Sequence, residues 1–352
     1  MSSRTFLVLV SALLVTLALL FTSLERKQNL GQELLMPGLA VAVNDIDQIE
    51  LRRAGREAIA TLQLSENGWT VAERSGYPAD LGKIRQNILT LAGARIIEEK
   101  TSDPQLYRRL GVEDIDSGEA SGVEIAIRAP TQTMTLIVGD TGVQGDNAFV
   151  RRAGEVRSWL VSADLDLGRN TADWLARELI DIPAESVQAV EITRTDGSKL
   201  RIEKNAPEDS DFNVTNIPQG RELSYASVAS GTGSVLSGLS FDDVAAADEV
   251  SVDGIAPIVT RFDCFDGLVV QVMTYESDDA VWTRFSFSAN AELATRFRDE
   301  DDSEDDAQER DNAVRTLADE LEQRHRPWLY NLPSYKSDQL VKRLEDLLKP
   351  AA

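Results

Sequence analysis

The side chains that carry most enzyme and metal chemistry are scarce in this chain of 352 residues. His325 is its only histidine and Cys264 its only cysteine. Nucleophile triads and most metal sites need histidine, and a zinc ion at His325 would have to take its other ligands from Cys264 and carboxylates. We therefore predict no catalytic, cofactor-binding or metal-ligating residues, and a protein that is not an enzyme.

The surroundings of both residues favour structural roles. Arginines flank His325 and would hold its charge change near or below neutral pH. A lone histidine at the start of a strand is typical of a surface or capping position. Phe262 and Phe265 beside Cys264 indicate a strand, so we expect a buried and inert thiol.

Acidic residues are the remaining source of chemistry. The chain has 59 Asp and Glu against 36 Lys and Arg, a formal net charge of −23, which argues against a nucleic-acid partner. The acidic run at residues 299–311 lacks the central glycine and regular oxygen spacing of a calcium loop, and we expect a solvated, disordered insertion there. A hydrolase that uses carboxylates alone stays an alternative, although proximity in sequence singles out no acid–base pair.

Two glycine-rich stretches resemble phosphate-binding loops only in composition. Residues 139–147 lie between two expected strands, and their Gly, Asp and Asn residues are typical of a hairpin loop. Residues 230–234 lack the Gly-Lys-Ser/Thr ending of a P-loop, which favours a loop or the small-residue start of a helix.

The clearest prediction concerns location. Residues 6–21 contain only Ser11 and Thr16 as polar residues, and with Leu24 the run approaches the ~20 residues of a membrane-spanning helix. A signal-peptide cleavage site after Ser23 or Thr22 would place the large residue Phe21 or Leu20 at its −3 position, so we expect an uncleaved transmembrane anchor at residues 6–24. Residues 1–5 would form a short cytoplasmic tail.

The orientation of this anchor is less strongly specified. Arg4 precedes the apolar run, while Arg26 and Lys27 follow it, so the positive-inside rule hardly decides the case. A tail of this length favours a single-pass protein of the inner membrane with its body on the periplasmic side.

The rest of the chain reads as two similar modules. Ile46, Ile49 and Leu51 align with Val187, Val190 and Ile192 at one constant offset, and each set follows an apolar lead-in with a proline. Short alternating segments bounded by Gly, Asp and Asn then predict antiparallel strands in the same order. Those strands are expected at 58–64, 68–71, 123–128, 134–138 and 158–161, and again at 199–203, 211–214, 258–262, 268–275 and 327–330.

Helical patterns complete the predicted modules. One helix is expected around residues 84–91, with a counterpart at 225–239, and others at 103–111, 312–323 and 337–349. We predict an α+β fold: a transmembrane helix, a linker and lead-in at 25–43, and two antiparallel-sheet-plus-helix modules at 44–165 and 170–350, the second containing the acidic insertion. The apolar stripes of 312–323 and 337–349 would pack on their own sheet or, alternatively, dock on a partner.

Several of these segments resemble a known family. The matching pieces, in order, are residues 35–39, 43–51, 68–71, 76–80, 100–112, 138–151, 158–161 and 174–175. Together they resemble the bacterial family called domain of unknown function 4340, most strongly over residues 34–192. The resemblance implies a fold and no active site. It also implies membrane-anchored envelope proteins whose genes accompany ABC-type transport systems and auxiliary subunits like those of gliding motility.

These observations lead to one expected function and two alternatives. We expect a non-enzymatic accessory or interaction subunit of an ABC-transporter-like membrane complex, recruiting its protein partner through sheet edges. A periplasmic module that binds a small molecule, peptide or glycan between the two copies is the first alternative, and the carboxylate-only hydrolase is the second. Tryptophans are the candidates for lining such a ligand site: Trp69, Trp159, Trp174, Trp282 and Trp328.

Overall fold

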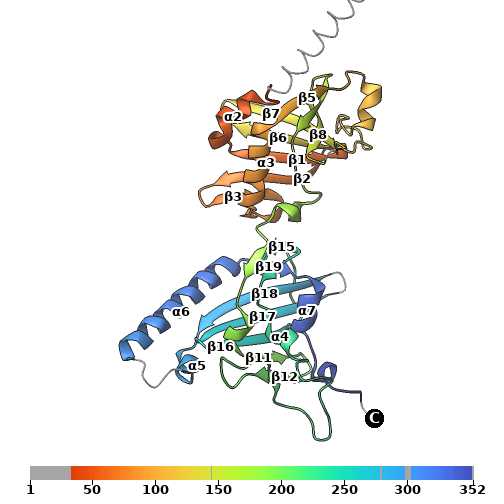
Figure 1. Cartoon of the computed structure of the whole chain (residues 1–352). Coiled ribbons are helices and arrows are strands. Elements are labelled where there is room, and N and C mark those ends of the chain that lie inside the picture. The colour runs from red at the N-terminus through yellow and green to blue at the C-terminus, as the bar shows by residue number, and fades with distance from the viewer. Residues whose placement is uncertain (1–32, 144, 278–279, 298–302, 351–352) are drawn as a thin grey trace, which may run out of the picture. The chain divides into compact units, whose positions relative to one another are not determined.

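A computed structural model describes residues 33–143, 145–277, 280–297 and 303–350. The chain divides between Ala176 and Arg177 into two compact units (Figure 1). Each unit is built on a large antiparallel sheet with helices, so the predicted α+β class is confirmed. The expected anchor at 6–24 lies outside the described residues. Within the described ranges, no helix has the length and apolar character needed to cross a membrane.

The first unit has a nine-stranded sheet in the order β4-β3-β2-β1-β6-β7-β8-β9-β5. Its strands are β1 (Gln48–Arg53), β2 (Glu57–Ser65), β3 (Gly68–Val71), β4 (Tyr77–Pro78), β5 (Arg95–Glu99), β6 (Val123–Ala129), β7 (Gln132–Thr141), β8 (Asn147–Arg152) and β9 (Ser158–Ser162). Its helices are α2 (Pro37–Ala42) and α3 (Leu81–Gly93), with 3₁₀ turns η1 (Val43–Asp45), η2 (Ala54–Arg56), η3 (Ala72–Arg74), η4 (Pro104–Arg109) and η5 (Thr171–Trp174).

Helix α3 forms where the apolar spacing predicts it. Asp80 caps the helix by accepting a hydrogen bond from the backbone N–H of Lys83 (2.9 Å). Ile84, Ile88 and Leu91 form the buried face of the helix, together with Asn87. The core of the first unit includes this face and the apolar side of the sheet, where Ile49 lies opposite Leu62 and Ile127.

The second unit has an eight-stranded sheet in the order β13-β12-β11-β16-β17-β18-β19-β15, and a two-stranded sheet of β10 and β14. The strands are β10 (Glu178–Ile180), β11 (Val187–Thr193), β12 (Lys199–Glu203), β13 (Asn213–Val214), β14 (Leu239–Ser240), β15 (Asp243–Ala246), β16 (Ile258–Cys264), β17 (Leu268–Glu276), β18 (Val281–Ala289) and β19 (Trp328–Asn331). The helices are α4 (Ser230–Gly233), α5 (Ala291–Thr295), α6 (Glu304–His325) and α7 (Ser334–Leu340), with 3₁₀ turns η6 (Ala184–Ser186) and η7 (Leu344–Leu347).

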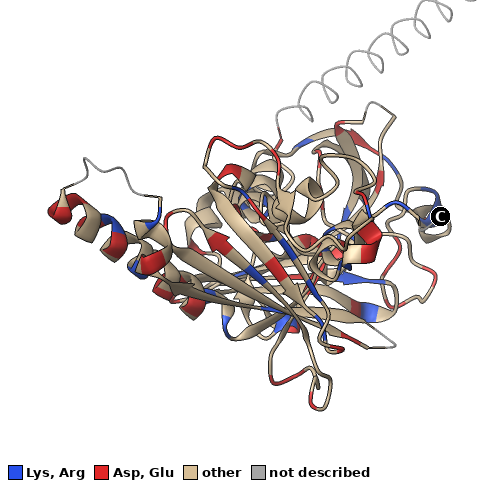
Figure 2. Cartoon of the chain, turned by 90° about the horizontal axis from the view of Figure 1, so that it is seen from below, with Lys and Arg blue, Asp and Glu red and all other residues tan. Residues whose placement is uncertain are grey.

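The two faces of this second sheet differ in chemistry. Val190, Ile202 and Phe262 lie opposite one another across three strands and are fully buried. The other face carries cross-strand ion pairs, such as Lys199 with Glu191 (2.8 Å). Lysine, arginine, aspartate and glutamate are accordingly mixed along the strands in Figure 2. Period-2 alternation is thus what places one side of the sheet in the core.

The two large sheets share a strand order. Strands β1, β2 and β3 correspond to β11, β12 and β13, strands β6 to β9 correspond to β16 to β19, and β5 corresponds to β15. The lead-in segments form similar pairings, because Leu34 bridges to Arg95, the first residue of β5, and Glu178 pairs with Ser240 shortly before β15. A large difference lies between β18 and β19, where α6 stands in place of the short connection between β8 and β9.

Three predicted helices are shorter than the sequence pattern suggested. The segment 225–239 contains only the four-residue α4, because Gly231, Gly233 and Gly238 lower helix propensity. The ring of Phe212 also lies against Gly233 and leaves no room for a side chain there. Residues 104–109 form a 3₁₀ helix, and 337–349 are split between α7 and η7.

The acidic insertion was predicted wrongly in its second half. Residues 304–311 are the first turns of α6 instead of a disordered loop. The hydroxyl of Ser303 accepts a hydrogen bond from the backbone N–H of Asp306 (3.1 Å), and three acids occupy the first turn. Negative side chains at a helix N-terminus are stabilised by the helix dipole, so these acidic residues favour the start of α6.

Replacing Ser303 with alanine should loosen the start of α6. Loss of an N-cap costs about 1 kcal/mol, which corresponds to roughly fivefold faster opening of the first turn. Hydrogen exchange over residues 304–311 measures this opening, and Ser198→Ala, in the β11–β12 turn, provides a matched control. Unchanged exchange in Ser303→Ala would show that the cap does not hold this helix.

Candidate functional site

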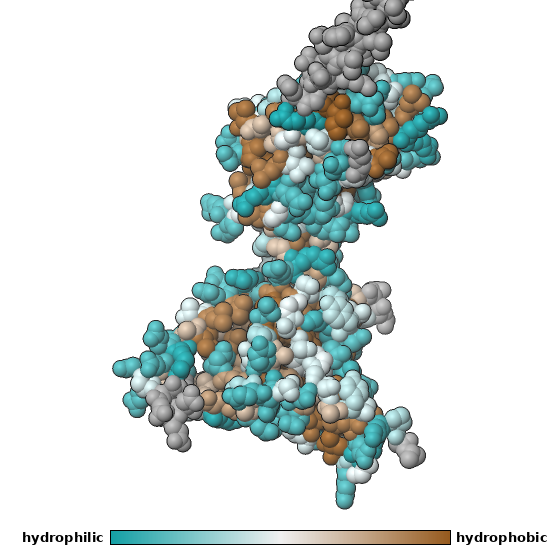
Figure 3. Space-filling model, in the orientation of Figure 1, coloured by the Kyte–Doolittle hydropathy of each residue, from teal (hydrophilic) through white to brown (hydrophobic). Residues whose placement is uncertain are grey.

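The second unit contains an apolar groove of about 660 Å³ alongside α6. Hydrophobic side chains gather beside this helix on the surface seen in Figure 3. We call this recess the α6 groove, and its lining residues are Glu178, Leu179, Ile180, Asp181, Ile182, Gly238, Leu239, Ser240, Leu268, Leu317, Leu321 and Arg324.

The apolar lining comes from two directions. Leu179 and Ile180 of β10 are more than nine-tenths buried, as is Leu239 of β14. Helix α6 supplies Leu317 and Leu321, which are four residues apart and so lie on one stripe of the helix. Leu317 is 42% exposed, so the groove presents apolar surface to solvent.

Charges surround this apolar lining. Asp181 accepts a hydrogen bond from the backbone N–H of Gly238 (2.7 Å), and its negative charge acts on the nearby ammonium group of Lys336. Neither Glu178 nor Arg324 makes an ion pair with another residue that the structure describes. Helix α6 itself carries eight acids against three arginines, and more red than blue lies along it in Figure 2. The groove is therefore apolar inside and predominantly negative around its edge.

His325 packs the C-terminal end of α6 against the sheet. Its side chain is 1% exposed, Nδ1 lies 2.8 Å from the hydroxyl of Tyr330, and its ring packs against that of Phe287 (5.4 Å between centroids). Burial, together with the positive charge of Arg324, lowers the pKa of His325 to about 4. The predicted surface or capping position was wrong, because α6 continues through His325 and turns it onto the sheet.

The environment of His325 opposes a positive charge. Its Nε2 is buried and has no hydrogen-bond partner in the described part of the chain. Phe287 and Tyr330 face it from β18 and β19, and the nearest carboxylate on its own helix, Glu322, accepts from the backbone N–H of Phe287 (2.8 Å). A proton on the imidazole would therefore lack a counter-charge, as the lowered pKa indicates.

The predicted burial of Cys264 is confirmed. It ends β16 on the buried face of the sheet and is 1% exposed. Burial, with Asp266 and Asp263 nearby, raises the pKa of the thiol. The thiolate that reacts with electrophiles is consequently suppressed.

This burial predicts an unreactive thiol. Iodoacetamide at neutral pH should leave Cys264 unmodified in the folded chain and alkylate it fully in denaturant, as intact-mass measurement would show. Rapid modification of the folded protein would contradict the buried position.

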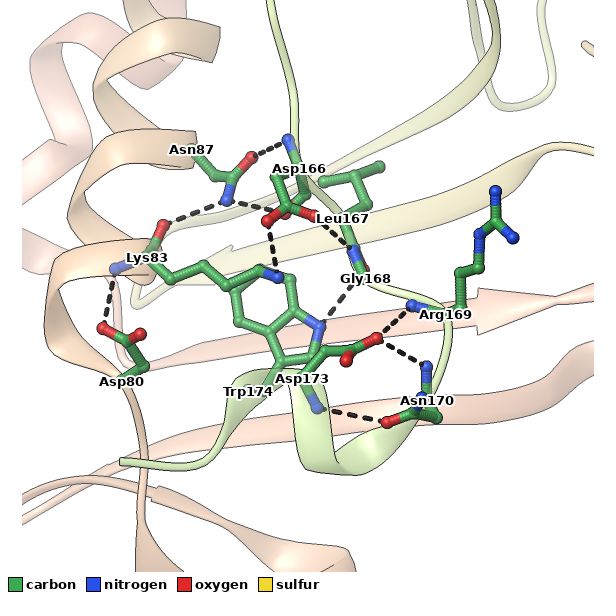
Figure 4. Close-up of polar contacts among 10 residues, drawn as sticks. All are labelled: Asp80, Lys83, Asn87, Asp166, Leu167, Gly168, Arg169, Asn170, Asp173 and Trp174. Atoms are coloured by element: carbon green, nitrogen blue, oxygen red, sulfur yellow. Dashed lines mark hydrogen bonds and ion pairs between the residues drawn. The ribbon is translucent and has the colours of Figure 1, made fainter. Parts of the chain in front are cut away.

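A polar network fastens the end of the first unit to α3 (Figure 4). Asn87, only 2% exposed, donates to the carbonyl of Asp166 (2.9 Å) and accepts from its N–H (3.0 Å). Lys83 pairs with the Asp166 carboxylate (2.8 Å) and lies over the ring of Trp174, whose indole N–H donates to Leu167. These groups satisfy one another, which assigns the network a structural role.

A recess in the first unit has a lining whose buried cation is already engaged by neighbouring groups. This opening of about 600 Å³ beside η4 is lined by Tyr107, Arg151 and several acids. Arg151 is buried, donates to Val112, Glu155 and Asp114, and stacks on Tyr107 (4.6 Å). With its guanidinium already engaged, this recess is a weaker binding candidate than the α6 groove.

The tryptophans do not gather at the groove. Trp159 and Trp174 are buried within the first unit, and none of the five tryptophans lines the α6 groove. Among the described residues, no cluster of three or more His, Cys, Asp or Glu side chains is arranged to hold a metal ion.

The comparisons with known proteins identify a family. The model for the domain of unknown function DUF4340 matches residues 69–255, which is more than half of the chain. The chain belongs to this family, as the resemblance of its sequence motifs predicted. Neither the curated proteins nor the solved structures yielded a match.

Proposed function

We propose that this chain is a non-enzymatic, single-span inner-membrane protein that serves as an accessory or interaction subunit of an ABC-transporter-like complex. The apolar run at residues 6–21 supports the anchor, with the two units on the periplasmic side. The association with transport systems rests on the family resemblance.

The α6 groove carries the interaction role. It combines an exposed apolar lining with charged residues at its edge, and none of its lining residues is histidine, cysteine or lysine. Such a surface suits recognition, because apolar anchors supply affinity and the charged rim supplies selectivity. The shared strand order of the two sheets supports a further part of the proposal, that the units are copies of one module of which the second gained α6.

Native electrophoresis of mildly solubilised membranes tests this role. The full chain should migrate as part of an assembly larger than the chain alone. A variant that keeps the N-terminal segment but lacks residues 33–350 should no longer associate with the partners. Migration of the full chain as a free monomer in every mild detergent would contradict the proposal.

The size of the groove also favours a second candidate, a small ligand. About 660 Å³ falls within the range of small-molecule sites. A thermal-shift screen of the purified chain distinguishes the two, because a ligand that raises the unfolding temperature of wild type but not of Leu321→Asp would favour a ligand-binding module.

A further inference from the structure

We infer that the α6 groove binds an apolar segment of a partner protein that is flanked by lysine or arginine. This inference rests on the proposed interaction role and names the partner chemistry. Helix α6 is a large difference between the second unit and the first, since β8 and β9 are joined by a connection of a few residues. The groove exists because this added helix supplies one of its walls.

The apolar lining defines the centre of the partner segment. Leu317 remains 42% exposed although it lies beside the buried leucines of β14 and β17. An apolar side chain entering here would cover Leu317 and Leu321 together, which is the geometry of an anchor residue surrounded by a polar rim. The two-stranded sheet of β10 and β14 keeps the opposite wall in place.

The charges define the flanks. Glu178 and Asp181 carry negative charge on the β10 side, and α6 adds the surplus of its eight acids over three arginines. Arg324 is the only cation among the lining residues. An acidic segment, or a lipid with an anionic head group, would meet repulsion from Glu178 and Asp181 and from the net negative charge of α6 as a whole, whereas a basic segment gains attraction during approach.

Photocrosslinking in intact membranes tests this inference. The full chain is produced with a photoreactive amino acid at Leu317 or, as control, at Gln323, which is exposed on another side of α6 and outside the groove. We expect at least tenfold more protein adduct at 317. Sequencing of the crosslinked peptide should show apolar residues with lysine or arginine beside them.

A charge reversal then tests the electrostatic part. Glu178→Lys should reduce the crosslink at 317 at least fivefold, while Glu66→Lys, at the turn between β2 and β3, makes the same charge change outside the groove and should leave it unaltered. Equal yields at 317 and 323, a crosslinked peptide without basic residues, a lipid adduct or insensitivity to Glu178→Lys would each overturn the inference.

Failure of this inference can be told apart from failure of the proposed function. If the double variant Leu317→Asp/Leu321→Asp purifies with the same partners as the wild type, the groove assignment is wrong and the accessory role survives. If no partner purifies with wild type, the accessory role itself fails.

Discussion

Replacing Asn87 with alanine should destabilise the first unit by about 3 kcal/mol. The side chain is buried and makes three hydrogen bonds, two of them to the backbone of Asp166 and one to that of Lys83. Its removal breaks all three hydrogen bonds of this buried amide, and each hydrogen bond contributes about 0.5–1.5 kcal/mol to stability. Denaturant unfolding of the purified chain, with hydrogen exchange over residues 164–174, measures the loss.

A matched control separates this effect from the general cost of losing an asparagine. Asn216 is exposed and donates one hydrogen bond to the carbonyl of Lys199 (2.9 Å), so Asn216→Ala should cost less than about 1 kcal/mol. Equal destabilisation by the two variants would show that the network around Asn87 does not hold α3 to the end of the unit.

Mild acid should destabilise the second unit through His325. The folded-state pKa of about 4 lies below the ordinary value of 6.5, so the unfolded chain binds the proton more readily. The stabilisation is fully present above pH 6.5 and is lost as the pH falls from 6.5 towards 4. At about 1.4 kcal/mol per pH unit, unfolding between pH 6.5 and 5 should become easier by roughly 2 kcal/mol.

This pH window separates histidine from the carboxylates. The pKa values of Glu191 and Asp196 are lowered by hydrogen bonds and ion pairs, so their contribution is lost only at more acidic pH. Denaturant titrations at pH 6.5 and 5 should show the loss in wild type and little of it in His325→Phe. A wild-type chain with constant stability over this window would contradict the buried neutral imidazole.

Local patterns in the sequence were sufficient to predict α3 and many of the strands, but β5, β8, β15 and β18 were not among the predicted strands. The alternation of apolar and polar residues located β1, β2, β6 and β7, because one face of each strand is directed to the core and the other to solvent. The family motif around Gly139 also has a physical basis in the structure. The backbone of Leu110 and Gly111 lies so close that a side chain at Gly139 would collide with it.

Features that depend on distant parts of the chain were not predictable in this way. The apolar stripe of α6 was recognised, but the sequence did not show that Ala318 is buried while Leu317 is left exposed beside β10. Likewise, the arginines flanking His325 suggested a surface position, whereas contacts with Phe287 and Tyr330 decide its burial. The α6 groove and the burial of the pH-sensitive His325 both follow from tertiary packing.

Affinity purification of the tagged full-length chain from gently solubilised membranes, with partners quantified by mass spectrometry, tests the proposed accessory role most directly. We expect an ABC-type permease or one of its auxiliary subunits in amounts close to those of the chain itself. Recovery of the chain alone, before and after crosslinking, would contradict a role as an accessory subunit.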